Sequence, residues 1–442
     1  MTVHFIAIGG SAMHNLAIAL KQKGYKVSGS DDEIHDPALS RLKAYNLLPE
    51  YIGWNPEKIT NNLDAVILGM HAKSDNPELL KAKELGLKIY SYPEYLYEAS
   101  KDKTRIVVGG SHGKTTITAM ILHVMQQLGI ETDYMVGAKL EGFDVMVKIS
   151  DAKYMVLEGD EYLSSPMDLR PKFHLYKPNI AIINGIAWDH INVFPTFDIY
   201  IEQFKIFADK IVPNGSLVYF QDDENIVKIA KSTREDIKKF PYKELSEELV
   251  KKYPLKIFGK HNLINISAAM IALEQIGVKQ EDFLKAMQSF KGASKRLELI
   301  AETPTQAFYT DFAHSPSKLK ATVEAMKNQF SERKLTAVME LHTFSSLTKE
   351  FLSQYKGCMD LADNAAIYFN SHALELKRLP NLDKNLIYSC FAKEGLQIFT
   401  TKEEVEEFVI NNSQNQENIL MMSSGNFGGI DLKALSQKIL KN

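Results

Sequence analysis

The chain has 442 residues, of which 45% are hydrophobic and 24% charged, a composition typical of a globular protein with several cores. At about 150 residues per domain, this length predicts about three domains. The 52 basic and 55 acidic residues give a net charge of -3, which argues against a polyanionic partner such as nucleic acid.

Cysteine usage and hydropathy indicate a reducing, aqueous compartment. Cys358 and Cys390 are the two cysteines, and their unrelated contexts predict neither a disulfide framework nor a metal site. No apolar run reaches transmembrane length, and no basic leader precedes the first predicted strand. We therefore expect a cytoplasmic protein without a membrane partner.

The first hundred residues alternate between strand and helix patterns. Predicted strands over 3–8 and 25–28 flank a glycine turn and an amphipathic helix. The turn and the later Asp31 resemble a dinucleotide fold, in which the turn approaches a diphosphate and the acid accepts a hydrogen bond from a ribose hydroxyl. The full Gly-x-Gly-x-x-Gly pattern is absent, so NAD binding is the weaker alternative. Predicted strands at 65–68 and 87–90 complete this unit, and the polar run 99–103 is the expected linker.

A glycine-rich loop over 109–116 follows the apolar strand 105–108 and precedes a helical pattern over 117–122. At such a turn, backbone N–H groups and a lysine can bind phosphate, and the hydroxyl after the lysine can hold Mg²⁺. The generic consensus requires glycine where Val108 stands, and an ordinary glycine-rich turn is the alternative.

Two further strands, 153–157 and 179–183, should end beside this loop, because ligands bind at the carboxyl ends of parallel strands. The first leads to Glu158 and the second to His190, and a carboxylate and an imidazole suit divalent metal. A capping acid and a hydrogen-bonded core histidine are the alternatives.

Later segments offer amide and cationic side chains. Lys205 lies in a predicted helix, where a solvated lysine is the default. Asn262 and Asn265 are three apart at the start of a helix reaching 276, so their amides can meet a common ligand, although Asn262 could instead cap the helix. Arg296 is a candidate planar clamp on phosphate.

The remaining chain predicts a third α/β domain without repeats or low-complexity segments. Strands are expected at 307–309, 335–339, 365–369 and 419–422, with helices beginning at Pro316 and spanning 403–410.

Together these motifs resemble the Mur ligases along nearly the whole chain. The matching residues are Gly9 to Met13 with Asp31, the loop 110–116, Glu158, Asp189-His190, Gly259-x-His261-Asn262-x-x-Asn265, Arg296 and Asp311-Phe312-Ala313-His314-x-Pro316. The shortened phosphate loop is the form that this family uses. The resemblance implies an α/β protein of three domains: a Rossmann-like UDP-sugar-binding domain over 1–103, a central P-loop ATPase domain over 104–296, and a Rossmann-like amino-acid or peptide-binding domain over 297–442.

The resemblance also implies the reaction. The opening segment and His112 are similar to the branch that acts on UDP-N-acetylmuramate, and the segment 422–430 is similar to the ending of murein peptide ligases. This implies an ATP- and Mg²⁺-dependent ligase that joins L-alanyl-γ-D-glutamyl-meso-diaminopimelate to UDP-N-acetylmuramate through an acyl phosphate, in peptidoglycan recycling. A ligase that adds L-alanine, in biosynthesis, is the alternative, and a nucleotide-binding regulator without ligase activity is the alternative of another class. The expected partners are small molecules only, and the expected state is a monomer or a weak homodimer.

The implied site residues fall into four groups. The catalytic residues are Lys114, Glu158, His190 and Arg296. The ATP-binding residues are Gly110, Ser111, His112, Gly113, Lys114, Thr115, Thr116, His261, Asn262, Asn265, Arg296 and Asp311. The UDP-sugar-binding residues are Gly9, Gly10, Ser11, Ala12, Met13, Asp31 and His71. The metal ligands are Thr115, Glu158 and His190, and Lys205 matches the spacing of a lysine that several members carbamylate.

Two positions depart from the family pattern. Thr310 stands where an acid is often found, and the segment 340–346 lacks the arginine that usually follows this strand of the third domain. The contacts to the incoming substrate are therefore expected to differ.

Overall fold

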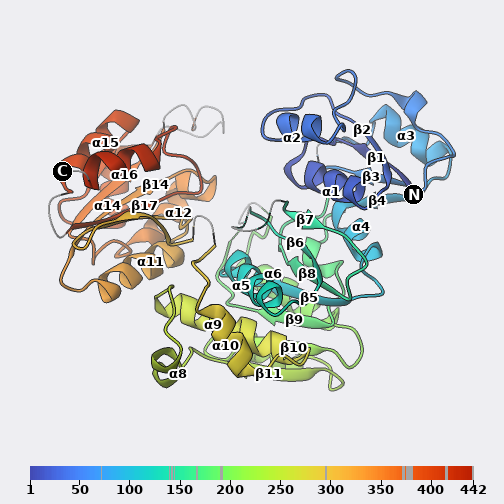
Figure 1. Cartoon of the computed structure of the whole chain (residues 1–442). Coiled ribbons are helices and arrows are strands. Elements are labelled where there is room, and N and C mark those ends of the chain that lie inside the picture. The colour runs from blue at the N-terminus through green and yellow to red at the C-terminus, as the bar shows by residue number, and fades with distance from the viewer. Residues whose placement is uncertain are drawn as a thin grey trace. The chain divides into compact units, whose positions relative to one another are not determined.

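The computed structural model describes residues 1–70, 72–138, 140, 143, 145–165, 168–189, 193–293, 296–370, 374, 382–413 and 417–440. Within these residues the chain forms three β-sheets of four, seven and six strands (Figure 1). One compact unit, residues 1–243 with 265–287, contains the first two sheets, and a second, residues 244–264 with 288–442, contains the third. The expected α/β class with three domains is confirmed, whereas the limits at 103 and 296 remain predictions.

The first sheet is parallel, with strand order β2-β1-β3-β4. Helix α3 packs on it through Leu79 and Ala82, which join Ile6, Val66 and Leu68 in one apolar core. The elements of this part are β1 (Thr2–Ile6), α1 (Ser11–Gln22), β2 (Lys26–Ser30), α2 (Ala38–Ala44), η1 (Pro56–Lys58), β3 (Ala65–Leu68), α3 (Pro77–Glu84), β4 (Ile89–Ser91) and α4 (Tyr92–Glu98).

The second sheet has the order β11-β10-β9-β5-β8-β6-β7, in which only the two-residue β7 is antiparallel among the described strands. Strand β5 lies between β8 and β9, so the carboxyl ends of these three strands meet at one edge. The elements are β5 (Thr104–Gly109), α5 (Lys114–Gln127), β6 (Thr132–Met135), β7 (Val147–Lys148), β8 (Tyr154–Glu158), η2 (Lys172–His174), β9 (Ile180–Ile183), α6 (Phe197–Asp209), β10 (Ser216–Phe220), α7 (Glu224–Ser232), β11 (Lys238–Tyr242) and α10 (Gln280–Met287).

The third sheet has the order β12-β13-β17-β14-β15-β16, with β12 antiparallel at one edge. Helices α15 and α16 cover one face through Val405, Val409, Leu435 and Ile439. The elements are α8 (Glu247–Lys252), β12 (Glu298–Glu302), β13 (Ala307–Asp311), α11 (Pro316–Gln329), β14 (Lys334–Glu340), η3 (Ser345–Leu347), α12 (Lys349–Leu352), η4 (Ser353–Tyr355), β15 (Asn364–Tyr368), α14 (Lys384–Phe391), β16 (Gln397–Phe399), α15 (Lys402–Asn411), β17 (Glu417–Met422) and α16 (Leu432–Leu440). Helix α9 (Lys260–Glu274) contains the boundary between the two units.

The buried strands predicted from the sequence match observed strands within one or two residues at each end. Helix α3 begins at Pro77, where the Asn76 side chain accepts hydrogen bonds from the first amides of the helix. The predictions do not include the edge strands β7, β11, β12 and β16, since a half-exposed edge strand needs no continuous apolar run. They also do not include the interior strands β6 and β10, which are short and begin with polar residues. None of the described helices is both long enough and apolar enough to cross a membrane.

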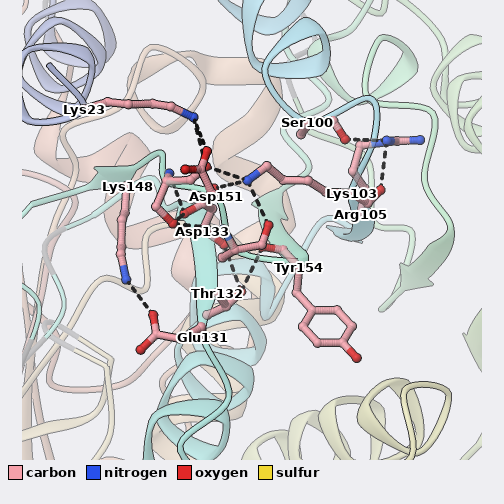
Figure 2. A network of polar contacts seen from close by, with 12 residues as sticks. Lys23, Ser100, Lys103, Arg105, Glu131, Thr132, Asp133, Lys148, Asp151 and Tyr154 are labelled. Atoms are coloured by element: carbon pink, nitrogen blue, oxygen red, sulfur yellow. Dashed lines mark hydrogen bonds and ion pairs between the residues drawn. The ribbon is translucent and has the colours of Figure 1, made fainter. Parts of the chain in front are cut away.

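The polar run expected to be a linker is a hydrogen-bonded turn between α4 and β5. Arg105 Nη1 donates to the carbonyls of Ser100 (2.6 Å) and Lys103 (3.1 Å). Lys103 Nζ donates to the buried Asp133 Oδ2 at 2.6 Å and to the Ser150 carbonyl at 2.8 Å (Figure 2). Side-chain hydrogen bonds therefore connect the start of β5, which leads to the phosphate loop, to the end of α4 and to the segments that contain Asp133 and Ser150.

Candidate nucleotide and metal site

The glycine-rich loop connects the carboxyl end of β5 to the start of α5, as the sequence predicts. Gly110 (φ +131°) and Gly113 (φ +72°) adopt backbone conformations that favour glycine. A Cβ on Gly113 would lie 2.4 Å from both Asn184 Nδ2 and Asn265 Oδ1. The loop therefore packs against these two amides more closely than any side chain would allow.

Lys114 opens helix α5 and is held by a carboxylate. Its Nζ lies 2.6 Å from Glu161 Oε2 and 2.8 Å from the Gly110 carbonyl. Burial alone would lower the pKa of Lys114, but Glu161 and Asp160 oppose this effect and the net pKa is raised. The ammonium group is therefore charged at neutral pH, as a phosphate-binding lysine must be.

A hydroxyl network connects this ion pair to the loop. Tyr200 on α6 donates to Glu161 Oε1 at 3.0 Å, and its hydroxyl lies 3.0 Å from Ser111 Oγ. Ser111 Oγ also accepts a hydrogen bond from the Ala187 amide at 2.9 Å. The loop, the end of β8 and α6 are thus coupled through side chains.

Thr115 and Glu158 bring two oxygen ligands together beside the loop. Thr115 Oγ1 donates to Glu158 Oε1 at 2.7 Å, and the Gly137 amide donates to Glu158 Oε2 at 2.8 Å. Both side chains are buried, and a hydroxyl with a carboxylate is a donor set that suits Mg²⁺. When bound by these two residues, Mg²⁺ would neutralise phosphate charge.

No group of three His, Cys, Asp or Glu side chains in the described part of the chain is arranged to hold a metal ion. His190, the third predicted ligand, lies outside the described residues. Thr116 is buried in α5, next to Thr115.

The other predicted ATP residues lie in the second unit, except Asn265. Asp311 accepts hydrogen bonds from the amides of Leu297 (2.5 Å) and Ala313 (2.7 Å), and burial raises its pKa. The Arg296 guanidinium lies 4.4 Å from the centre of the Phe312 ring. Burial lowers the pKa of His261, although Asp311 opposes this shift. The structure thus groups His261, Arg296 and Asp311.

Asn262 lies in the first turn of α9 rather than at its cap. Its Nδ2 donates to the Phe258 carbonyl at 2.8 Å, which leaves Oδ1 as the side chain's acceptor. Its predicted role in ATP binding remains a prediction.

The Asp31 carboxylate accepts a hydrogen bond from the predicted UDP-sugar turn. The Gly9 amide donates to Asp31 Oδ2 at 2.6 Å, and a Cβ on Gly9 would lie 2.9 Å from the same oxygen. Burial raises the pKa of Asp31, while the Gly9 hydrogen bond opposes the shift. Gly10 precedes the start of α1, where Ser11 and Ala12 are exposed and Met13 is buried. His71 lies outside the described residues.

Lys205 lies on α6 with about half of its side chain exposed, and its Nζ is 3.5 Å from Glu202 Oε1. This is the solvated surface arrangement that a helical lysine adopts by default. Carbamylation of Lys205 remains a prediction.

Sequence reasoning missed Glu161, Asn184 and Tyr200 as members of this site, and also Tyr242, whose hydroxyl donates to Asn184 Oδ1. Asn184 directly follows a predicted strand and Glu161 lies three residues after the end of β8, and these positions were the available signal. Tyr200 and Tyr242 carry no local signal, since buried aromatic residues in helices and strands are ordinary core residues.

Comparisons with known proteins agree with this arrangement. A family model described as "Mur ligase family, catalytic domain" matches residues 2–104, and one described as "Mur ligase middle domain" matches residues 108–273. A UDP-N-acetylmuramate--L-alanine ligase from Caldicellulosiruptor bescii is 31% identical over 95% of both chains. The chain belongs to the Mur ligase family.

Other Mur ligases match at full length. A UDP-N-acetylmuramate--L-alanyl-gamma-D-glutamyl-meso-2,6-diaminoheptandioate ligase from Haemophilus influenzae is 27% identical over 99% of both chains. The crystal structure of a UDP-N-acetylmuramate-alanine ligase from Thermotoga maritima has a TM-score of 0.69 at 20% identity and covers 100% of this chain and 98% of that one, which shows the shared fold. Mur ligases are ATP-dependent enzymes that form amide bonds in peptidoglycan synthesis and use Mg²⁺, and this chain shares that chemistry.

Proposed function

We propose that this Mur ligase joins L-alanyl-γ-D-glutamyl-meso-diaminopimelate to the lactoyl carboxylate of UDP-N-acetylmuramate, as a peptide ligase of peptidoglycan recycling. The segment 422–430, similar to the ending of such ligases, supports this substrate. The name of the relative from Haemophilus influenzae supports it as well.

The observation that carries the proposal is the contact between Glu340 and this C-terminal segment. The buried Glu340 Oε2 accepts hydrogen bonds from Ser423 Oγ and from the Phe427 amide, the latter at 2.8 Å. Phe427 adopts a positive φ of +52°, and its ring stacks on Tyr368. One carboxylate at the end of β14 therefore holds the segment that follows β17.

Glu340 also lies close to an exposed imidazole. His342 Nδ1 lies 3.7 Å from Glu340 Oε1, and the His342 side chain is 40% exposed. Burial alone would raise the pKa of Glu340, but the nearby His342 and the hydrogen bonds from Ser423 and the Phe427 amide reverse the effect, so this pKa is lowered. His342 stands in the segment that lacks the usual arginine, at strand carboxyl ends where open α/β sheets bind ligands. We assign it to the incoming peptide.

The predicted site residues have complementary roles in this reaction. The muramyl carboxylate attacks the γ-phosphorus of ATP, ADP leaves, and an acyl phosphate forms. Lys114 and Arg296 offset the repulsion between these anions. The peptide amine then attacks the acyl carbon, loses a proton, and phosphate leaves.

The test is phosphate release with ATP, Mg²⁺ and UDP-N-acetylmuramate, comparing the tripeptide with L-alanine and identifying the product by mass. The proposal predicts a higher kcat/KM with the tripeptide.

In Glu340→Gln, the KM for the tripeptide should rise roughly tenfold, since a charged acceptor is worth about 1.5 kcal/mol or more. The KM for ATP should stay unchanged. As a matched control, Glu302→Gln alters an exposed glutamate of the same unit and should change neither value.

Addition of L-alanine is the second candidate, because the relative from Caldicellulosiruptor bescii carries that name. A preference for L-alanine in the same assay would establish it. Phosphate release without an amide product would instead indicate a regulator without ligase activity, and stabilisation by NAD would indicate an oxidoreductase.

We further propose that the enzyme acts in the cytoplasm on small molecules alone, as a monomer or weak homodimer. The near-neutral charge supports the absence of a nucleic-acid partner. Sedimentation at micromolar concentration tests the oligomeric state.

A further inference from the structure

Asn184 connects the phosphate loop to Asn265. It follows β9 and is 6% exposed. Its Nδ2 lies 2.8 Å from Asn265 Oδ1 and 3.3 Å from the His112 carbonyl oxygen. Tyr242, at the end of β11, donates its hydroxyl hydrogen to Asn184 Oδ1. Three polar side chains thus form a buried chain that ends beside Gly113.

The partners of Asn184 determine which way each amide faces. The His112 carbonyl can only accept, so the Asn184 atom that faces it must be Nδ2. The same Nδ2 faces Asn265, whose facing atom must then be the acceptor Oδ1. The Asn265 Nδ2 group consequently points away from Asn184, as a hydrogen-bond donor.

The Asn265 amide lies at the phosphate loop. A Cβ on Gly113 would touch Asn265 Oδ1 at 2.4 Å, so this amide packs against the residue that precedes Lys114. A nucleotide bound to this loop would offer acceptors to a donor beside it. These acceptors are phosphate oxygens and purine ring nitrogens.

We propose that Asn184 is a positioning residue which, with Tyr242, orients the Asn265 amide so that its Nδ2 donates to the bound nucleotide. This inference rests on the proposed role of Asn265 in ATP binding. Asn184 itself contacts the loop and Asn265.

The main test is the dissociation constant of ADP for Asn184→Asp. An aspartate can only accept, so it repels Asn265 Oδ1 and turns the amide until its oxygen faces the nucleotide. We expect a loss of roughly tenfold in ADP affinity, the size expected for one lost hydrogen bond. Asn265→Ala should lose about as much.

The double variant Asn184→Asp/Asn265→Ala separates positioning from general damage. Because it has no amide to orient, it should bind ADP no more weakly than Asn265→Ala alone. Asn179→Asp makes the same chemical change at the other end of β9, where Oδ1 accepts from the Arg105 amide, and should bind ADP normally. Binding of UDP-N-acetylmuramate and the thermal midpoint confirm that each variant is folded.

If Asn184→Asp does not fold, Tyr242→Phe replaces it. Loss of that hydroxyl should weaken ADP binding by about threefold, and this effect should vanish in the Asn265→Ala background. Measuring the same losses of affinity with 7-deaza-ADP, which lacks purine N7, identifies the nucleotide atom that accepts from Asn265. Equal losses for both nucleotides indicate a phosphate oxygen, and a loss for ADP alone indicates purine N7.

Two results would overturn the proposal. One is wild-type ADP affinity in Asn184→Asp together with weak binding in Asn265→Ala. The other is a tenfold loss that persists in the double variant. Wild-type affinity in Asn265→Ala would instead remove the proposed ATP role of Asn265, and the inference with it, while leaving the ligase assay unaffected.

Discussion

Lys114 Nζ and Glu161 Oε2 form an ion pair at 2.6 Å, in which the glutamate is almost fully buried. The cation that should meet ATP phosphates is thus already held by a carboxylate, which Tyr200 in turn holds in place. Phosphate must compete with Glu161 for Lys114. This relationship makes the ion pair a determinant of nucleotide affinity.

Replacing Glu161 with glutamine should strengthen nucleotide binding. Glutamine keeps the shape and the contact to Tyr200 but removes the charge that opposes phosphate. We expect the dissociation constant of ADP, measured by calorimetry, to fall roughly tenfold, equivalent to about 1.4 kcal/mol. Glu98→Gln, on an exposed ion pair, is the control. Weaker binding would show that Glu161 holds Lys114 in its binding geometry.

Lys114→Ala should reduce turnover by about a hundredfold or more, because one preorganised electrostatic donor is worth on the order of 3 kcal/mol. Phosphate release at saturating substrates measures the effect. Lys148→Ala removes a lysine that forms a surface ion pair and should retain wild-type turnover. Full activity of Lys114→Ala would remove this residue from the mechanism.

Glu158→Gln should raise the Mg²⁺ concentration needed for half-maximal activity by about tenfold or more. The amide keeps an oxygen for Thr115 but loses the charge that binds the metal. A titration of activity with Mg²⁺ measures the change. An unaltered Mg²⁺ curve would assign the metal to other residues.

Gly113→Ala should abolish detectable nucleotide binding. The added methyl group would lie 2.4 Å from two amide atoms, and the backbone at φ +72° is strained for any residue with a Cβ. Gly129→Ala is a matched control, since Gly129 also has a positive φ (+67°) but nothing within 4 Å. Equal losses in both variants would point to backbone strain rather than crowding at the loop.

His174 predicts a pH dependence of stability. Burial lowers its pKa to about 4, and its Nε2 donates to the Gln203 carbonyl at 2.8 Å. The neutral ring therefore contributes stability that is complete above pH 6.5 and is lost as pH falls toward 4. The loss can reach about 3 kcal/mol, at about 1.4 kcal/mol per pH unit.

Urea unfolding at pH 7 and pH 5 measures this dependence. His174→Gln, which can still donate to Gln203, should show a smaller difference between the two pH values. An unchanged difference would assign the acid sensitivity to other groups.

The sequence by itself determined the α/β class, most of the buried strands and the loop between β5 and α5. Apolar runs, glycine positions and the lysine at 114 are local, and each carries its own physical signal. Glu158 was placed correctly beside the loop, because parallel strands bring their carboxyl ends together.

Only the tertiary structure decided which side chains meet. Glu161 and Tyr200 are 39 residues apart, and Asn184 and Asn265 are 81 apart, yet both pairs form buried hydrogen bonds. Glu340 reaches Phe427 across 87 residues in the same way. Hydrogen bonds act over about 3 Å and depend on how strands and helices pack, so no local pattern of residue types encodes their partners.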